Sequence, residues 1–187
     1  PSFMDALASS NWLIPDGVGI ILSAQILNTN VPIRLTGPDL FYATMAQLNI
    51  SGGSVFFLGS SETTLSKIRA KILFDYPNVQ LCGTYSPPFK KTFDINDNRL
   101  MLRAINNAAP DVLWVGLTAP KQEKWLHDNR NKLKVSFAGA IGAAFDFYAG
   151  TISRAPKFIQ KIGLEWLYRF CMSPYRLGAR NLLSTPK

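Results

Sequence analysis

Short apolar runs alternate along the chain with longer stretches in which apolar residues recur every three or four positions. The short runs predict strands buried on both faces, and the periodic stretches predict amphipathic helices. The predicted strands cover residues 12–15, 54–58, 79–82, 111–117 and 135–138. The predicted helices cover residues 3–12, 20–27, 40–48, 62–73, 96–109 and 120–131, the first of them running into the first strand.

Most of the predicted strands are followed by a loop containing glycine and then by a helix. This order is typical of an α/β fold: a Rossmann-like parallel sheet with helices on both faces. Two helix starts carry N-cap signals, at Thr36 or Asp39 and at Ser60 or Ser61. Since parallel sheets bind ligands where their strands end, the loops after the strands are the first places to look for chemistry.

The last part of the chain, residues 154–187, has a different composition. It holds seven Lys or Arg against one acid, Glu165, which gives +6 of the chain's net +8. Large apolar side chains alternate with these charges, and several fall at helical spacing: Ile159, Ile162, Trp166 and Phe170. We therefore expect two domains, an α/β catalytic domain over residues 1–153 and a basic, aromatic helical appendage over 154–187 that meets an anionic membrane surface.

Composition limits the remaining possibilities. Residues 1–153 hold 13 basic and 11 acidic side chains, so the body of the protein need not bind a polyanion. The sequence contains no run of roughly 20 apolar residues, the length that a membrane-spanning helix needs. Cys82 and Cys171 show neither metal-ligand spacing nor a CxxC pair, so we expect reduced thiols in a cytoplasmic protein. Because the chain opens with Pro1, we also expect natural residues upstream of it.

Four loops at predicted strand ends carry the candidate chemistry: Asp16, Gly59-Ser60, residues 119–123 and residues 139–146. Glycines there let backbone amides approach a ligand, and helix N-termini favour phosphate, so a nucleotide or another phosphate ester is the implied ligand. Each glycine can also be an ordinary turn residue. No GxGxxG follows a strand and no GxxxxGK[ST] occurs, which gives no support to a dinucleotide site or a P-loop.

Asp16, at the end of the first predicted strand, is a candidate general base, although the same position suits an N-cap for the next helix. Arg34 forms either an ion pair with Asp39 or a clamp on two phosphate oxygens. At the start of a helix, Lys121 and Gln122 offer hydrogen bonds to a base or sugar.

Two acids and the single histidine complete the candidate set. Glu123 either completes a helix cap or belongs to the site. Asp146 either fixes a uracil or ribose of the ligand or accepts hydrogen bonds from local backbone amides. We interpret His127 as a surface residue. No Asp-x-Asp occurs, so the usual carboxylate pair that holds a metal on a nucleotide sugar is missing.

Taken together, the motifs resemble those of the WecG/TagA/CpsF glycosyltransferases over residues 11–180. The matching segments are Pro15-Asp16-Gly17-Val18-Gly19, Arg34 to Leu40, Phe57-Leu58-Gly59, Tyr76-Pro77, Pro110-Asp111, Val115-Gly116-Leu117, Pro120 to Trp125, Gly142 to Gly150, Arg154-Ala155-Pro156 and Gly163 to Arg176.

The resemblance implies an inverting transfer of a sugar from a UDP donor to a polyprenyl-diphosphate-linked saccharide, in bacterial cell-surface polysaccharide synthesis. The sugar would be N-acetylmannosamine, its uronic acid or a hexose such as glucose. Neither a metal nor another cofactor is implied, and neither is nucleic acid. The protein would lie at the cytoplasmic face of the cell membrane, where self-association is a further expectation.

Several residue roles also follow from the resemblance. Asp16 would be the catalytic base. Substrate would be bound by Arg34, Thr36, Gly59, Lys121, Gln122, Gly142, Asp146 and Arg154. The membrane or the acceptor would be met by Arg169, Arg176 and Arg180. The chain departs from the family pattern at residues 86–89 and at Thr118, both near the expected donor site.

Two other classes of function remain open at the level of sequence. The basic aromatic appendage also suits a nucleic-acid-binding module that stacks bases on aromatic rings. A non-catalytic interaction protein that keeps the fold is the other alternative.

Overall fold

The computed structural model describes residues 2–29, 31, 34–161 and 164–172. The chain divides into two compact units, residues 1–151 and residues 152–187. The described part of the first unit holds one parallel sheet with strand order β2-β1-β3-β4. Its strands are β1 (Ser54–Gly59), β2 (Gln80–Tyr85), β3 (Val112–Gly116) and β4 (Phe137–Ala140). The predicted α/β fold is confirmed.

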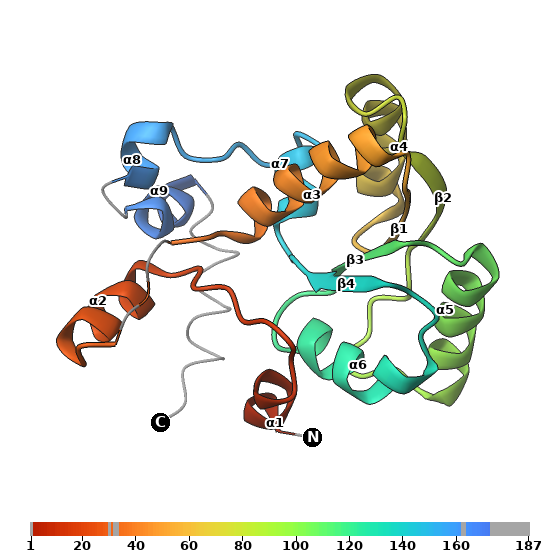
Figure 1. The fold of residues 1–187 in the computed structure, drawn as a ribbon, viewed down its shortest axis with the longest axis horizontal. Helices are drawn as coiled ribbons and strands as arrows, with labels where there is room; N and C mark the ends of the chain where they lie inside the picture. The colour runs from red at the N-terminus through yellow and green to blue at the C-terminus, as the bar shows by residue number, and fades with distance from the viewer. Residues whose placement is uncertain (1, 30, 32–33, 162–163, 173–187) are drawn as a thin grey trace. The chain divides into compact units, whose positions relative to one another are not determined.

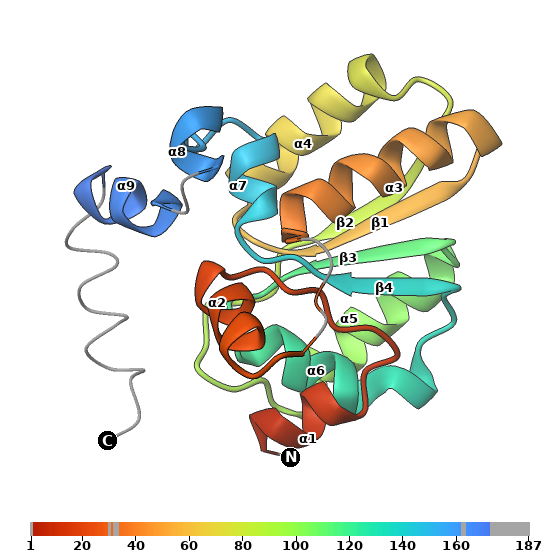
Figure 2. The ribbon, with the colours of Figure 1, turned by 60° about the vertical axis from the view of Figure 1, so that its left-hand side comes forward.

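Helices cover both faces of this sheet, as Figures 1 and 2 show. One face carries α3 (Gly37–Ser51), α4 (Glu62–Asp75) and α7 (Ala144–Tyr148). The other face carries α5 (Ile95–Ala108) and α6 (Lys121–Asn129), which continues into a 3-10 turn over Arg130–Lys132.

The core forms two layers because successive strand residues point to opposite faces. Val55 and Phe57 pack against α3, α4 and α7, whereas Phe56 and Leu58 pack against α5 and α6. Since both faces are covered, the middle strands have apolar residues at successive positions, Val55 to Leu58 in β1 and Val112 to Val115 in β3, which is why their short runs were visible in the sequence. The largest side chains buried to below 2% exposure include Trp114, Tyr148, Phe41, Phe57 and Phe145.

The strand predicted over residues 12–15 is wrong. Residues 12–17 lie outside any helix or strand, and both Trp12 and Leu13 are exposed, at 77% and 60%. A strand requires a hydrogen-bonded neighbour, and the sheet of the described residues pairs no strand with this segment. The apolar run alone therefore predicted a strand that has no partner here.

Helix starts follow the cap signals of the sequence. Thr36 caps α3 in a capping box with Asp39, and Ser61 caps α4 by accepting a hydrogen bond from the Thr64 amide. Helix α2 (Val18–Ile26) has Gly17 as its N-cap and no side-chain cap. Asp16 is therefore not the N-cap of α2, so the N-cap interpretation of this residue is wrong.

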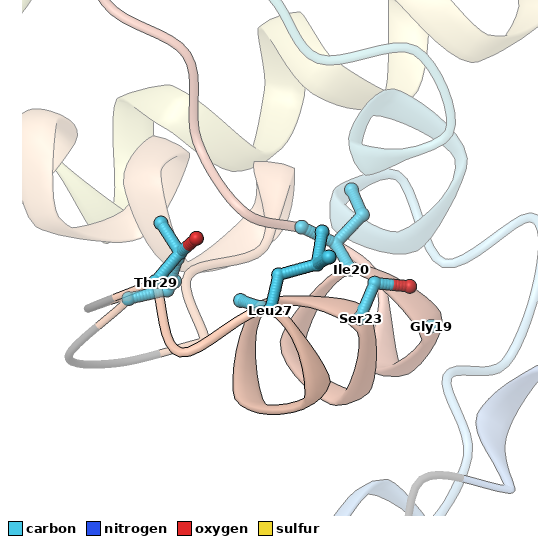
Figure 3. A pocket seen from close by; sticks show the side chains of 7 residues that line it. Gly19, Ile20, Ser23, Leu27 and Thr29 are labelled. Atoms are coloured by element: carbon cyan, nitrogen blue, oxygen red, sulfur yellow. The ribbon is translucent and has the colours of Figure 1, made fainter.

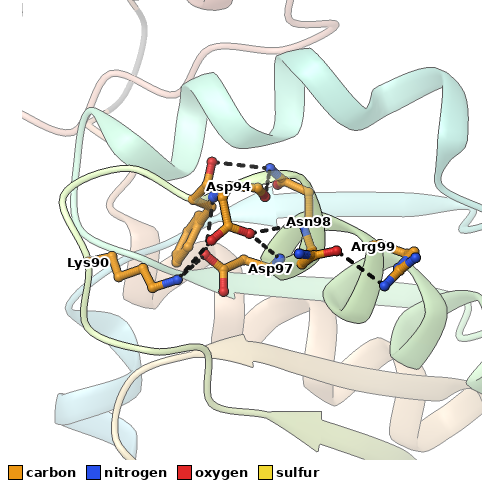
Figure 4. Close-up of polar contacts among 7 residues, drawn as sticks. Lys90, Asp94, Asp97, Asn98 and Arg99 are labelled. Atoms are coloured by element: carbon orange, nitrogen blue, oxygen red, sulfur yellow. Dashed lines mark hydrogen bonds and ion pairs between the residues drawn. The ribbon is translucent and has the colours of Figure 1, made fainter.

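The start of α5 is tied to the loop that follows β2 (Figure 4). Asp94 and Asp97 form a capping box, and Lys90 Nζ donates to both carboxylates at 3.0 and 2.8 Å. These bonds raise the pKa of Lys90 and lower that of Asp94. Lys121 Nζ donates to the carbonyl oxygen of Lys90 at 2.9 Å, so the loop is linked to the start of α6 as well.

The N-terminal helix α1 (Phe3–Ala8) packs on α6. Ser2 and Asp5 close a capping box at its start. Just after its end, Ser9 Oγ lies 2.6 Å from His127 Nδ1. The single histidine thus has a structural contact, in keeping with its surface interpretation.

In the second unit, the described residues form α8 (Lys157–Lys161) and α9 (Glu165–Met172). Arg154 Nε lies 3.6 Å from Glu165 Oε1, and the Glu165 residue is only 8% exposed. Among the residues that the structure describes, no helix is long and apolar enough to cross a membrane.

Candidate functional site

Unusual backbone conformations gather where three strands of the sheet end. Gly59 closes β1 with φ of +111°, and Ser60 follows with φ of +61°. Thr118, after β3, has φ of +52°, and Gly142, after β4, has φ of +48°. Such conformations are uncommon for residues with a Cβ atom and concentrate at functional sites. The carboxyl edge of the sheet is therefore the first candidate for a binding site.

Gly59 has a steric reason as well as a conformational one. A Cβ atom added at this position would lie 2.5 Å from the carbonyl oxygen of Gly116 on β3. The Ser60 amide donates to the same oxygen at 3.1 Å. The ends of β1 and β3 are thus held together by backbone atoms, which only glycine at position 59 permits.

Asp16 reaches this edge although it does not follow a strand. Its carboxylate Oδ2 lies 3.5 Å from the backbone amide of Gly37, the first residue of α3. The Asp16 residue as a whole is exposed to solvent. The positive end of the α3 dipole favours the charged carboxylate, and the contact fixes where it points.

Close packing connects the start of α3 to the loop after β4, and that loop to Gln122 of α6. A Cβ atom on Gly37 would lie 3.3 Å from the carbonyl oxygen of Ile141, directly after β4. A Cβ atom on the next residue, Gly142, would lie 3.4 Å from Gln122 Oε1. Asp16, the α3 N-terminus, the β4 loop and Gln122 therefore form one continuous patch, which we call the carboxyl-edge site.

Gln122 is a deeply buried polar residue of this site, at 5% exposure. Its Nε2 donates to Glu123 Oε1 at 2.9 Å, whereas its Oε1 has no hydrogen-bond partner in the part of the chain that the structure describes. A buried amide oxygen without a partner costs about 1 to 3 kcal/mol relative to a satisfied one. The arrangement offers a ready acceptor to a ligand that brings an N–H or O–H group.

Lys121 is turned toward the loop after β2 instead. Besides its bond to the Lys90 carbonyl, its ammonium lies 4.6 Å from the centre of the Phe93 ring. Burial lowers the pKa of Lys121. Its described contacts are structural, so its predicted role in binding substrate stays a prediction.

Three other predicted residues lie around the start of α3 and in α7. The hydroxyl of Thr36, a buried residue, donates to Asp39 Oδ2 at 2.6 Å. Arg34, two residues before this cap, is partly buried. Asp146 Oδ1 accepts a hydrogen bond from the side-chain hydroxyl of Thr151 at 3.2 Å, which is not one of the backbone amides expected from the sequence. A direct role for any of them in binding substrate stays a prediction.

The predicted residues of the appendage lie in the second unit. Arg154 is engaged with Glu165, as described above. The side chain of Arg169 is outside what the structure describes, and so are Arg176 and Arg180 entirely. Their expected roles at the membrane or acceptor stay predictions.

Two contacts of the site were not predicted from the sequence. The Gly37 amide lies 3.5 Å from Asp16 Oδ2, and Glu123 accepts a hydrogen bond from the Gln122 amide. Gly37 lies directly after the cap residue Thr36, so a cap signal beside a glycine pointed to it. Nothing local in the sequence indicates the Glu123 contact, which depends on two adjacent side chains turning toward each other.

The fold and the site define a class of protein: a Rossmann-like α/β protein with a polar site at the carboxyl edge of its sheet, one exposed carboxylate and a buried amide. Comparison with known proteins gives the family. Residues 1–187 match the glycosyl transferase WecG/TagA/CpsF family. The chain belongs to this family, so it is an enzyme that transfers a sugar, as predicted.

Curated relatives carry a more specific name. An N-acetylglucosaminyldiphosphoundecaprenol N-acetyl-beta-D-mannosaminyltransferase of Bacillus subtilis (strain 168) is 31% identical over 99% of this chain and 69% of its own length. The enzyme of the same name from Bacillus spizizenii is 29% identical over 100% of this chain and 70% of its own. The enzyme of the same name from Staphylococcus aureus (strain MW2) is 24% identical over 95% of this chain and 67% of its own length.

Proposed function

We propose that this enzyme transfers a sugar from a UDP donor to a polyprenyl-diphosphate-linked saccharide, in the synthesis of a bacterial cell-surface polysaccharide. The acceptor follows from the relatives, whose names give N-acetylglucosaminyldiphosphoundecaprenol as the molecule that receives N-acetylmannosamine. The observation that carries the chemistry is the exposed Asp16 carboxylate at the α3 N-terminus, beside the buried Gln122 amide.

In this proposal, Asp16 is the general base. It takes the proton of an acceptor hydroxyl while the hydroxyl oxygen forms a bond to the anomeric carbon of the donor sugar. The bond from that carbon to the diphosphate oxygen breaks, and UDP leaves with the electron pair. One displacement inverts the anomeric centre, which accords with the β-linked product in the names of the relatives.

The donor diphosphate needs positive charge and hydrogen-bond donors. We assign these to Arg34 and to the backbone at the start of α3, because a helix N-terminus binds phosphate well. We propose that Gln122 Oε1 accepts a hydrogen bond from the base or sugar of the donor. The sequence has no Asp-x-Asp, and we propose that turnover requires no divalent cation.

We further propose that the enzyme works at the cytoplasmic membrane face, where a lipid-linked acceptor lies. The net charge of +6 in residues 154–187 supports attraction to anionic lipids, each basic residue near the surface contributing about 1 kcal/mol. Arg169, Arg176 and Arg180 are the residues proposed for that contact.

A transfer assay tests the proposal. A panel of UDP-sugars, including UDP-N-acetylmannosamine, is incubated with polyprenyl-diphosphate-linked N-acetylglucosamine and the enzyme in the presence of EDTA. We expect one donor to give a β-linked disaccharide, identified by NMR of the product. If every donor fails with EDTA and one succeeds with added Mg²⁺, the metal-independent mechanism is wrong. If all fail under both conditions, the proposed reaction is wrong.

A further inference from the structure

An uncharged, apolar surface begins directly after Asp16. The sequence has no Asp, Glu, Lys or Arg between Asp16 and Arg34. Within this stretch, α2 exposes large apolar side chains on more than one side: Ile20 at 53%, Leu22 at 53% and Ile26 at 81%, followed by Leu27 at 73%. Elsewhere in the first unit, exposed large apolar residues occur singly, as at Ile50 and Phe89, or in adjacent pairs, as at Leu73 and Phe74. A gathered patch of this kind marks an interaction site.

The patch is hollowed on one side (Figure 3). A groove of about 400 Å³ lies along α2 and the segment after it, and the side chains that line it include Ile20, Ser23, Ala24, Leu27, Thr29 and Val31. We call it the α2 groove. Its walls are mostly apolar, with the hydroxyls of Ser23 and Thr29 as the polar groups among these side chains. Such a lining suits a hydrocarbon ligand, and it would leave a charged one without a partner.

The position of the groove connects it to the carboxyl-edge site. Gly17 caps α2 and directly follows Asp16, and α2 lies on the side of the sheet at which the strands end (Figures 1 and 2). A helix of nine residues is about 13 Å long. The apolar surface therefore starts at the proposed base and extends about the length of a disaccharide away from it.

We infer that the α2 groove receives the isoprenoid chain of the lipid-linked acceptor, an inference that rests on the function proposed above. In such an acceptor the sugar is joined to the hydrocarbon through a diphosphate, so the reacting hydroxyl and the chain lie a short way apart. With the hydroxyl at Asp16, the chain needs an uncharged apolar surface close by, and the α2 groove supplies it.

Two other occupants fit the observations less well. A stable contact with a second copy buries about 1,200 to 2,000 Å² and favours a broad, flat face, whereas the groove has the volume of a small-molecule pocket. A helix that lies on a bilayer carries Lys or Arg along its polar side, and α2 has none.

The first test compares acceptors with a long and a short prenyl chain. In the full chain, Ile20→Ser and Leu27→Ser should raise KM about tenfold for the long-chain acceptor, since each removes apolar contact area, and leave KM for the short-chain acceptor unchanged. Ile50→Ser, at a position on α3 that is 80% exposed, is the control outside the groove and should change neither value. Equal changes for both acceptors would overturn the inference.

A second readout does not depend on turnover. Prenyl-diphosphate-linked N-acetylglucosamine with a photoreactive group on its chain is crosslinked to the protein in detergent, and the labelled peptides are identified by mass spectrometry. We expect label within residues 18–31, competed by unlabelled acceptor. Label there without any transfer activity would sustain the groove and refute the proposed reaction. Transfer activity with label only outside residues 18–31 would support the proposed reaction and overturn the inference about the groove.

Vesicles and sedimentation separate the other occupants. If Leu27→Ser abolishes binding to vesicles of anionic phospholipid that contain no acceptor, the groove meets the bilayer, and the inference is wrong. If Leu27→Ser converts an oligomer to a monomer in analytical ultracentrifugation, the groove is an interface between copies, and the inference is equally wrong. We expect both properties to match those of the wild-type protein.

Discussion

The two edges of the sheet differ in how their polar groups are used. At the amino edge, Asp111 Oδ2 accepts hydrogen bonds from the Ser54 amide and hydroxyl at 2.8 and 2.7 Å, which joins the starts of β3 and β1. At the carboxyl edge, Gln122 Oε1 is buried and has no hydrogen-bond partner among the described residues, and the exposed Asp16 lies at a helix start. The polar groups of the first edge complete the fold, and those of the second are the candidates for binding a ligand.

Backbone conformation separates the two edges in the same way. Near the amino edge, Gly52 and Ala109 have positive φ because each is the left-handed C-cap of a helix, an ordinary way to end one. At the carboxyl edge, Ser60 and Thr118 have positive φ in loops that follow strands. These two conformations do not terminate a helix, and each costs about 1 to 3 kcal/mol of backbone strain. The unusual conformations near the amino edge are therefore explained by helix ends, and those at the carboxyl edge are not.

The largest effect should come from removing the proposed base. Asp16→Asn keeps the size and the hydrogen bond to Gly37 but cannot take a proton, so we expect turnover to fall about 1,000-fold. UDP affinity by calorimetry and Tm should stay unchanged. Asp128→Asn, an exposed acid on α6, is the control and should retain full activity. Normal turnover by the Asp16 variant would show that another group is the base.

Gly59→Ala should have the next largest effect, through stability. Its Cβ would meet the Gly116 carbonyl oxygen at 2.5 Å, in a strand end with φ of +111°. We expect a loss of about 3 kcal/mol, roughly 6 to 12 °C in Tm by thermal denaturation. Gly19→Ala, where no atom lies within 4 Å of the added Cβ, should leave Tm unchanged or raised. Similar Tm losses in both variants would refute the steric argument.

Gln122→Met should reduce donor binding more modestly. Methionine has a side chain of similar length but lacks the Oε1 acceptor of glutamine. KM for the UDP-sugar should therefore rise 10- to 100-fold, about 1.4 to 2.8 kcal/mol. Tm should shift by only a few degrees. Asn129→Leu, on the same helix, removes a bond to the Trp125 carbonyl and should lower Tm without changing KM. An unchanged KM in the Gln122 variant would remove this residue from the site.

The smallest effect concerns Asp111 at the amino edge. Its bonds from Ser54 hold its pKa below the usual 3.8. A lowered native pKa adds stability that is present above the unfolded pKa and is lost as pH falls through the native one. Asp111→Asn should therefore lower Tm slightly at pH 7, with the difference shrinking below about pH 4. A difference that stays constant from pH 7 to 3 would contradict this, and turnover at pH 7 should be unaffected throughout.

Much of the fold was predictable because local signals agreed with burial. The run at residues 54–58 is apolar at successive positions because both faces of β1 are covered, and Ser61 and Thr36 mark helix starts by their side-chain bonds. The run at residues 12–15 shows the limit of such reasoning. Its apolar residues are typical of a strand, but a strand also needs a neighbouring strand to form hydrogen bonds with. The residues of the segment alone do not show whether such a neighbour exists.

The site was predictable by residue type more than by geometry. Asp16 was identified as a candidate base from the end of a strand that does not form, and its carboxylate reaches the sheet edge through Gly37 instead. Gln122 was identified at a helix start, but its burial and its bond to Glu123 depend on tertiary packing. The sequence thus indicated candidate residues, and the structure places Asp16 at the Gly37 amide and Gln122 next to Gly142.

Hydrogen exchange with and without UDP, in the presence of EDTA, tests the central claim that the carboxyl edge holds the site. We predict slower exchange on UDP binding in peptides that cover residues 36–40, 59–64, 117–123 and 141–146. Peptides at the amino edge, covering residues 52–54, 78–80 and 110–112, should exchange at the same rate in both samples. Protection confined to the amino edge, or none at saturating UDP, would contradict the account.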